Sequence, residues 1–451
     1  MANTYLTRTV SSGADITKCT FSFWVKRSIL GGDQRIFSNE NTTNKQLYIR
    51  FNANNTFTCY ARNGASTNAF SFDTNRVFRD CSSWYHFCIK FDSTQSTEAD
   101  RFKLYVNGVA ETSFSSASYP SLNELALFTN TSEKMNIGYN DGGNNQYFNG
   151  CLSHVYFTQG YAYDASTFGS VDATTGEWKI NTSPSVTYGT NGFLILKDGN
   201  TITDQSSNSN NFTSSGAGVT KTEDNPSNSF ATYVPAQVFH SGGHDTTNGG
   251  TVGTNSTNSW YWRPASLAAT TGKFYAEAKV TADGGGTLVI GIADLDDCVG
   301  YAPVDTHFGK TPVSPNGRGY AWYSDDGKIY YNDTSTSVIT SGEYGANDIL
   351  MIAMDLDNGA WYIGKNGSWL NSGDPTSGSS KTGAVNTWTG GGTWTFADAH
   401  ANSGEFSWNW GNGYFKTTAI SSEGTNASGI GKFEYNVPAN YTALSTKGLN
   451  E

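Results

Sequence analysis

Two Asn-Gly pairs in close succession are the feature that most restricts how this chain can fold. Asn358-Gly359 follows the apolar stretch 348–357, and Asn366-Gly367 follows the short stretch 360–365. Asn-Gly favours the positive φ angles of a two-residue type I′ turn, which joins neighbouring antiparallel strands. Together the two pairs predict a three-stranded antiparallel meander.

Short segments that alternate aromatic or aliphatic residues with polar ones extend the strand prediction to most of the chain. A further pair, Asn107-Gly108, predicts a hairpin turn directly after one of these segments. No segment shows a helical period of useful length. We therefore expect a nearly all-β chain, with strands in the segments 20–25, 47–51, 84–91, 102–106, 136–139, 150–157, 272–280, 287–292 and 406–411.

Composition and charge argue against several classes of protein. Charged residues make up 15% and aromatic residues 14% of the 451 residues. An average soluble domain is about 25% charged. A disordered chain would have few aromatic residues and dense charge, and a coiled coil would be rich in Ala, Glu, Lys and Leu, so both classes are excluded. The net charge of −11 comes from 39 acidic and 28 basic residues with no basic cluster, which argues against nucleic-acid binding.

The chain also lacks the usual signs of membrane insertion and of an oxidising compartment. No apolar run reaches the roughly 18 residues of a membrane-spanning helix, and MANTYLTRTVSSG lacks the layout of a secretory signal. We expect synthesis in a cytosol. The six cysteines contain no C-x-x-C pair, so we expect buried free thiols: Cys19, Cys59, Cys81, Cys88, Cys151 and Cys298.

Two blocks of strands resemble known families. The first is similar to the concanavalin A-like, laminin-G-type jelly roll: 21–27 looks like its opening strand, 84–86 its central strand, 103–108 its hairpin and 148–157 its closing strand. The resemblance implies a β-sandwich over about the first 170 residues.

The second block is similar to SPRY domains, which are themselves concanavalin A-like sandwiches. Gly272 to Glu277 resembles their G-x-W-Y-W-E strand with Phe274 in the place of the first Trp, and the paired meander is their most recognisable feature. The resemblance covers about residues 240–418.

The predicted organisation is therefore all-β, with two concanavalin A-like jelly-roll β-sandwiches joined by a polar extension. We expect a laminin-G-like jelly roll over 1–170, a polar extension and linker over 171–239, an SPRY-like sandwich over 240–418 and a C-terminal tail over 419–451. One apolar piece inside the extension, 192–196, is a candidate strand that returns to the first domain.

The tandem of the two blocks resembles proteins of tailed bacteriophages, marine ones in particular, with similar connecting segments at 168–169, 188–193, 211–213 and 437–441. This resemblance implies a virion component, a capsid decoration, fibre or tail-associated protein, made in the host cytoplasm and carried on the virion. The partners it implies are other virion proteins and a host-surface glycan. Such proteins are typically homo-oligomers, so we expect a trimer.

Acidic residues offer weak candidates for chemistry. Concanavalin A-like glucanases place catalytic carboxylates on alternate positions of one strand, but their E-x-D-x-E run is absent. The nearest patterns are Asp355 with Asp357 and Asp294 with Asp296, and Asp at such positions also serves turns. The run 294–297 is a candidate Ca²⁺ loop or a solvated one. The histidines show no metal-binding spacing.

We therefore expect a binding protein that is not an enzyme, with no catalytic residue, metal or cofactor. The alternatives left open are a glycan depolymerase of the glycoside hydrolase type and a cellular carbohydrate-binding adhesin.

Aromatic residues supply the candidate ligand-binding site. Most of the 12 tryptophans fall inside predicted strands and are assigned to cores. Trp369, Trp388 and Trp394 fall in Gly-, Ser- and Thr-rich loop sequence of the second block. Exposed rings stack on sugars and proteins at a small entropy cost, so these three are the candidate binding rim. The alternative is that they cap the ends of the sandwich.

Overall fold

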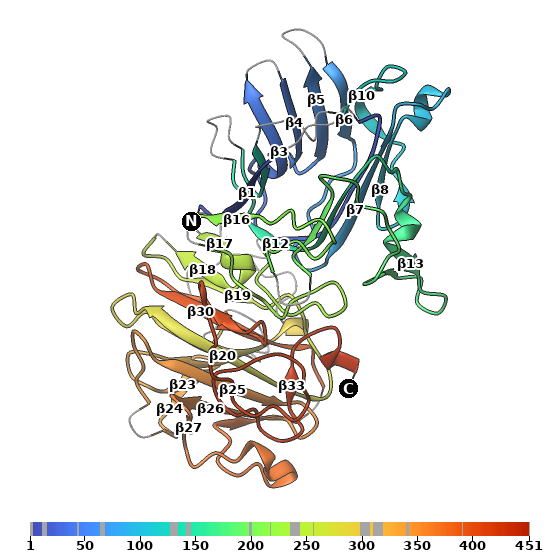
Figure 1. Ribbon diagram of the computed structural model, residues 1–451. Coiled ribbons are helices and arrows are strands. Elements are labelled where there is room, and N and C mark those ends of the chain that lie inside the picture. The colour runs from blue at the N-terminus through green and yellow to red at the C-terminus, as the bar shows by residue number, and fades with distance from the viewer. Residues whose placement is uncertain are drawn as a thin grey trace. The chain divides into compact units, whose positions relative to one another are not determined.

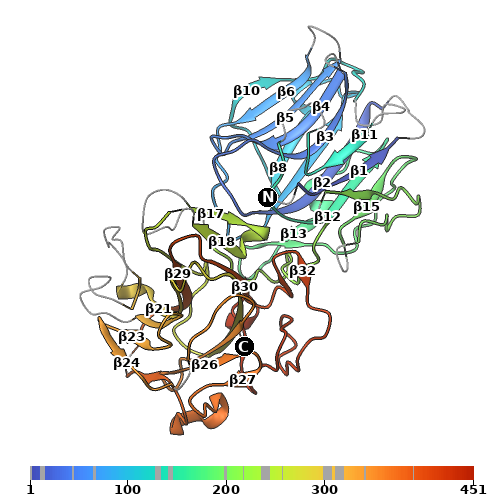
Figure 2. The ribbon, with the colours of Figure 1, turned by 90° about the vertical axis from the view of Figure 1, so that its left-hand side faces the viewer.

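The computed structural model divides into two compact units, residues 1–219 and 220–451, each built almost entirely of β-strands (Figures 1 and 2). It describes residues 3–10, 16–42, 45–63, 68–126, 134–140, 146–197, 201–216, 218–234, 244–255, 257–297, 307–309, 319–339, 342–389 and 391–450. In these ranges no helix is long and apolar enough to cross a membrane. The prediction of an all-β chain built from jelly-roll sandwiches is confirmed.

Unit 1 is a sandwich of two antiparallel sheets, visible as two layers in Figure 1. The eight-stranded sheet has the order β10 (Phe114–Ser118), β6 (Asn68–Thr74), β5 (Phe57–Asn63), β4 (Lys45–Phe51), β3 (Gln34–Thr42), β11 (Lys134–Ile137), β1 (Tyr5–Thr9) and β16 (Thr213–Ser215). The six-stranded sheet has the order β15 (Phe193–Ile195), β12 (Gly150–Gln159), β2 (Lys18–Arg27), β7 (Tyr85–Asp92), β8 (Phe102–Val106) and β9 (Val109–Ala110).

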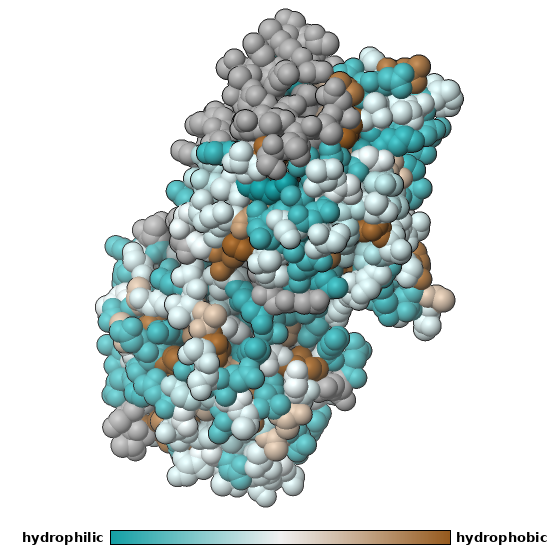
Figure 3. Space-filling model, viewed as in Figure 1, coloured by the Kyte–Doolittle hydropathy of each residue, from teal (hydrophilic) through white to brown (hydrophobic). Residues whose placement is uncertain are grey.

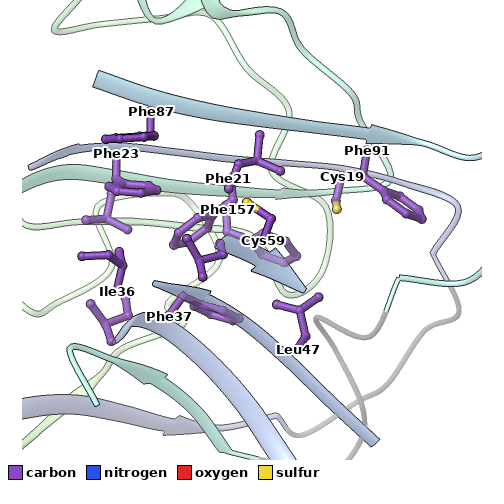
Figure 4. Close-up of a cluster of buried hydrophobic side chains, with 14 of the residues drawn as sticks. Cys19, Phe21, Phe23, Ile36, Phe37, Leu47, Cys59, Phe87, Phe91 and Phe157 are labelled. Carbon is purple, nitrogen blue, oxygen red and sulfur yellow. The ribbon is translucent and has the colours of Figure 1, made fainter. Parts of the chain in front are cut away.

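Phenylalanine rings fill the space between these two sheets (Figure 4). Phe23 on β2 stacks on Phe87 of β7 at 5.5 Å, and Phe57 on β5 stacks on Phe87 from the opposite sheet at 4.3 Å. Phe21, Phe37 and Phe87 are fully buried. Packed rings of this size supply much of the apolar area that a sandwich buries, and aliphatic residues such as Ile36, Leu47 and Ile89 fill the space between them.

The predicted linker differs from the structure. Strand β15 pairs with β12 and β16 pairs with β1, so residues 171–219 complete the two sheets of unit 1. The returning strand predicted at 192–196 is thereby confirmed. The polar composition of this segment predicted a linker. It contains instead two short edge strands, β15 and β16, between hydrogen-bonded turns. Residues 235–243 of the predicted linker lie outside the described residues.

The segment after β12 covers the outer face of the six-stranded sheet. It contains η3 (Ala165–Thr167) and the hairpin of β13 (Gly169–Val171) and β14 (Trp178–Ile180). Trp178 on β14 donates from Nε1 to Nδ1 of buried His86 at 3.1 Å. Because an indole can only donate, Nε2 of His86 carries the proton and donates to Ser22 Oγ at 2.9 Å. His86 is therefore a neutral structural residue and cannot accept the Ser22 proton in this arrangement.

His86 predicts an acid-sensitive fold. Burial lowers the pKa of His86 to about 3, from 6.5 for an unperturbed side chain. Its contribution to stability is complete above pH 6.5 and is lost as the pH falls toward 3, because only the unfolded chain takes up the proton. We expect urea unfolding of the full chain to show a loss of up to about 1.4 kcal/mol per pH unit that the variant His86→Gln lacks. Identical pH slopes in the two proteins would contradict this assignment.

Unit 2 is a second two-sheet sandwich. One sheet has the order β17 (His244–Thr247), β18 (Val252–Asn255), β30 (Glu405–Asn409), β20 (Lys273–Ala282), β25 (Ile349–Asp355), β26 (Ala360–Lys365) and β27 (Ser368–Trp369), with β28 (Asn386–Thr387) beside β26 and β33 (Thr442–Ala443) beside β20. The other has the order β19 (Tyr261–Pro264), β29 (Trp394–His400), β21 (Leu288–Asp294), β22 (Gly319–Tyr323), β23 (Ile329–Tyr331) and β24 (Thr334–Thr336). Unit 2 also contains the short elements η4 (Asn248–Gly250), η5 (Leu295–Asp297), η6 (Pro375–Ser380), β31 (Tyr414–Phe415), β32 (Thr418–Ala419) and η7 (Gly448–Asn450), and unit 1 contains η1 (Glu98–Asp100).

The predicted meander is present as β25, β26 and β27. Asn366 and Gly367 both have positive φ, 50° and 85°, as a type I′ turn requires. The first turn is longer than predicted because β25 ends at Asp355, whose carboxylate accepts hydrogen bonds from the backbone and side-chain nitrogens of Asn358 at 3.0 and 2.9 Å.

The predicted C-terminal tail belongs to the core of unit 2. Phe433, Val437 and Tyr441 are buried against Tyr275 and Tyr362 on the outer face of the larger sheet. Strand β33 pairs with β20 in parallel. The segment after residue 418 is therefore part of the fold.

Candidate functional site

The eight-stranded sheet of unit 1 presents a patterned outer face. On β4, Leu47 and Ile49 are buried in the core, whereas Tyr48 and Arg50 between and after them are half-buried. This alternation follows from the two-residue period of a strand. One side of the sheet packs on the phenylalanine core, and on β4 and β5 the side chains of the other side, such as Tyr48 and Tyr60, are partly exposed.

Strand register aligns polar and aromatic residues into a row across this outer face. Ser38 on β3 lies opposite Tyr48 on β4, Tyr48 opposite Tyr60 on β5, and Tyr60 opposite Ser71 on β6. Adjacent strands are about 4.8 Å apart. The two tyrosines therefore form a ring platform, with half-buried Ser71 on one side and fully buried Ser38, which donates to the Tyr139 carbonyl, on the other.

Guanidinium groups surround this platform. The Tyr48 and Tyr60 rings stack with centroids 4.9 Å apart. The Arg35 guanidinium lies 3.6 Å from the Tyr48 centroid and that of Arg50 lies 5.3 Å from it. Arg62 follows two residues after Tyr60 on β5, so it lies on the same face. We call these five residues the tyrosine-arginine face.

Hydrogen bonds hold part of the tyrosine-arginine face in place. Arg50 forms an ion pair with Asp33 at 2.7 Å. Gln146 links Arg35, whose Nε donates to Gln146 Oε1 at 2.7 Å, to Asp33 at 3.1 Å. Asp33 also accepts from the backbone nitrogen of Ala53 at 2.9 Å. A platform fixed in this way loses little conformational entropy on binding.

Electrostatics at Tyr48 favour the neutral phenol. Burial raises the pKa of Tyr48, and the neighbouring Arg50 and Arg35 only partly oppose this. The ring thus remains an uncharged stacking surface at neutral pH. Aromatic faces with nearby hydrogen-bonding groups suit ligands that carry both C–H patches and hydroxyls.

The predicted tryptophan rim requires correction. Trp388 and Trp394 are only 8% and 1% exposed and belong to the core of unit 2. Their centroids are 4.4 Å apart, and Trp394 also stacks on Tyr320 at 5.7 Å. Trp369 is partly buried beside Tyr275, so it retains an accessible part. Trp388 and Trp394 are therefore core residues.

The acidic candidates have structural partners. Asp355 is buried, pairs with Lys273 at 2.9 Å and closes the turn at Asn358. Asp357 accepts from the backbone nitrogen of Gly272 at 2.8 Å. Asp294 accepts from the backbone nitrogens of Asp296 and Thr393 at 3.1 and 2.9 Å.

The candidate Ca²⁺ loop at 294–297 has no cluster around it in the described part of the chain. A group of three or more His, Cys, Asp or Glu side chains that could hold a metal is absent from the residues with assigned positions. The Asp297 side chain lies outside the described residues.

The cysteines of the described residues are free thiols. Cys19, Cys59, Cys81 and Cys88 are buried and Cys151 is half-buried, while Cys298 lies outside the described residues.

The tyrosine-arginine face was not predicted from the sequence, although a signal for it existed. The strand segment 47–51 alternates apolar residues with Tyr48 and Arg50. In this alternation Tyr48 and Arg50 point away from the core, so the pattern predicts that they lie at the surface of the sheet. Its contacts with Tyr60 and Arg35 depend on strand pairing, which the sequence alone did not supply.

A model of a known protein family matches a large part of unit 1. Residues 2–162 match the model of the concanavalin A-like lectin/glucanases superfamily. This agrees with the laminin-G-like resemblance of the first block. No curated protein matches the chain.

Several solved structures are similar to parts of this chain at low sequence identity. The SPRY domain of human HERC1 has 12% identity and a TM-score of 0.30, covering 42% of this chain and 99% of the domain. The SAP-like pentraxin from Limulus polyphemus has 15% identity and a TM-score of 0.29, covering 43% and 89%. A protein from Bacteroides ovatus described as carbohydrate-binding has 15% identity and a TM-score of 0.31, covering 48% and 56%.

Proposed function

We propose that this chain is a non-enzymatic carbohydrate-binding protein that holds a glycan on the tyrosine-arginine face. The observation that carries the proposal is the stacked Tyr48–Tyr60 pair with guanidinium groups beside it on the outer face of a concanavalin A-like sheet. Sugar rings present C–H patches to aromatic faces and hydroxyls to charged donors. Both kinds of partner are present here within three neighbouring strands.

The surface of the protein is consistent with a polar ligand. On the side shown in Figure 3, the coloured residues are mainly hydrophilic, and hydrophobic ones occur in small separate groups. Broad apolar patches are typical of sites for protein or membrane partners. A hydroxyl-rich ligand needs no such patch.

Substitution of the platform rings tests the proposal. We expect Tyr48→Ala and Tyr60→Ala each to raise the Kd for a glycan found by array screening by about five- to thirtyfold, since a central interface ring contributes about 1–2 kcal/mol. Isothermal titration with the full-length chain measures this. Tyr161→Ala is the control, because Tyr161 is 43% exposed in unit 1 but follows β12 of the other sheet.

Two outcomes would contradict the proposed function. Unchanged affinity in both platform variants would place the glycan elsewhere. Release of reducing ends from the bound glycan, abolished by Asp355→Ala or Asp294→Ala, would instead support the depolymerase alternative.

We further infer that the protein is carried on the virion of a tailed bacteriophage, as a capsid decoration or a fibre. Support comes from the resemblance of the tandem of two sandwich blocks, and of the connecting segments 188–193 and 437–441, to proteins of such phages. Mass spectrometry of purified particles tests this placement, with hundreds of copies indicating the capsid and a few indicating the tail. Light scattering of the purified chain tests the expected trimer. Absence from purified particles would favour a cellular adhesin.

A further inference from the structure

We propose that the tyrosine-arginine face selects acidic glycans, with Arg62 binding a sugar carboxylate or sulfate. This inference rests on the proposed function, because it names the class of glycan for the same site. It starts from a difference among the three arginines of the face. Arg35 and Arg50 are occupied in building the platform, whereas Arg62 is not.

The partners of Arg35 and Arg50 account for their positions. Arg50 pairs with Asp33 at 2.7 Å, and Arg35 donates to Gln146 while lying over the Tyr48 ring. Their guanidinium groups therefore stiffen the stacking surface. A ligand that replaced these contacts would first have to break them.

Arg62 has no comparable partner among the described residues. Its side chain is half-buried, and none of the hydrogen bonds or ion pairs between described residues involves its guanidinium. An anionic ligand would supply an acceptor for the exposed part of this group.

Position strengthens the assignment. Tyr60 and Arg62 are two residues apart on β5 and point to the same side, so their Cα atoms are about 7 Å apart. Arg62 lies opposite Gln46, which is half-buried on the same face. A sugar ring stacked on Tyr60 would therefore place an acidic substituent next to a guanidinium and an amide donor.

The charge of the whole protein makes this arrangement selective. The chain carries a net charge of −11, so an acidic polymer is repelled by most of its surface. Among the described residues, this sheet face carries three arginines and the carboxylates of Asp33 and Asp73, a local excess of basic groups. Asp33 already pairs with Arg50, and Asp73 accepts from Thr58. This face is therefore less repulsive to an acidic ligand than the net charge of the chain suggests.

A matched pair of polymers tests the inference. Polygalacturonate and its carboxyl-reduced, neutral form share one backbone and differ in charge. We expect the full-length chain to bind the acidic form at least about tenfold more tightly, and Arg62→Gln to remove most of this preference, because a charge-assisted hydrogen bond contributes about 1.5–3 kcal/mol. Arg62→Lys should retain part of the preference. Arg79→Gln, which removes an exposed arginine of the loop after β6, should leave it unchanged.

The outcomes separate this inference from the proposed function. Equal binding of both polymers, unaffected by Arg62→Gln, would overturn the selection of acidic glycans and leave glycan binding in place. A preference for the acidic polymer that Arg79→Gln lowers as much as Arg62→Gln would overturn the role of Arg62. Binding of neither polymer would count against both.

Discussion

Replacing Trp394 with Ala is expected to lower the free energy of unfolding of unit 2 by about 3–5 kcal/mol, the usual cost of removing a large ring from a packed core. Trp394 is 1% exposed and stacks on Tyr320 with an interplanar angle of 4°. Its ring also contacts Trp388. The lost contacts leave a cavity that these rigid neighbours cannot fill. Urea unfolding of the full-length chain, followed by tryptophan fluorescence and near-UV circular dichroism, measures the change.

Trp369→Ala is the matched control for Trp394→Ala. Trp369 is partly buried at the edge of the same unit, so its removal should cost distinctly less. Neither variant should alter glycan binding, because both residues lie in unit 2 and the tyrosine-arginine face lies in unit 1. If Trp394→Ala unfolded like the wild type but bound glycan more weakly, the tryptophan rim would be restored.

Local sequence patterns sufficed for the strands and for several turns. Asn107-Gly108 and Asn366-Gly367 each have two positive φ angles, because this dipeptide accepts that conformation at little cost. The strand period likewise identified β2, β7 and β25. These features depend on residues close in sequence, so a single sequence contains the information.

The burial of Trp388 and Trp394 could not be read from local composition. The sequence between them is rich in glycine, which normally indicates an exposed turn. Here Gly392, at φ 141°, approaches so closely that a Cβ would lie 2.7 Å from Trp394 Nε1. The glycine permits close packing over a core ring. Only the position of the second sheet distinguishes this case from a solvent-exposed loop.

The same limit applies to the tyrosine-arginine face. Its residues come from β3, β4 and β5, and their meeting depends on a register that includes irregularities between Arg35 and Phe37 and between Ala61 and Arg62. A one-residue shift would move a side chain to the opposite face of the sheet. Sequence periodicity predicts that a strand has two faces, but it does not align three strands.

Glu277 on β20 explains why the C-terminal segment is part of the fold. Its side chain is fully buried. The carboxylate accepts hydrogen bonds from the backbone nitrogens of Glu434 and Tyr435, both at 2.8 Å, from Tyr275 Oη at 2.9 Å and from Asn409 Nδ2 at 3.3 Å. Glu277 and Glu434 are 157 residues apart along the chain. Their contact is therefore not visible in the local sequence, which predicted a free tail.

Glu277→Ala is therefore expected to lower the free energy of unfolding of unit 2 by about 3 kcal/mol or more, since it leaves two backbone donors without a partner at roughly 1–3 kcal/mol each. Tyr275→Phe is the matched control, because it removes one of the four donors and keeps the ring. It should cost about 1 kcal/mol. Thermal and urea unfolding of the full-length variants measure both changes. Equal losses in the two variants would show that the backbone of the C-terminal segment does not depend on Glu277.

The loss caused by Glu277→Ala should also depend on pH. Burial raises the pKa of Glu277 from 4.5 to about 7, although the four donors oppose this shift. The folded chain therefore keeps a proton that the unfolded chain releases, so the stability linked to Glu277 is complete below pH 4.5 and declines as the pH rises to 7. The decline is at most about 1.4 kcal/mol per pH unit. The difference between the wild type and Glu277→Ala should accordingly be larger at pH 4.5 than at pH 8, and a constant difference would mean that the carboxylate stays ionised in the fold.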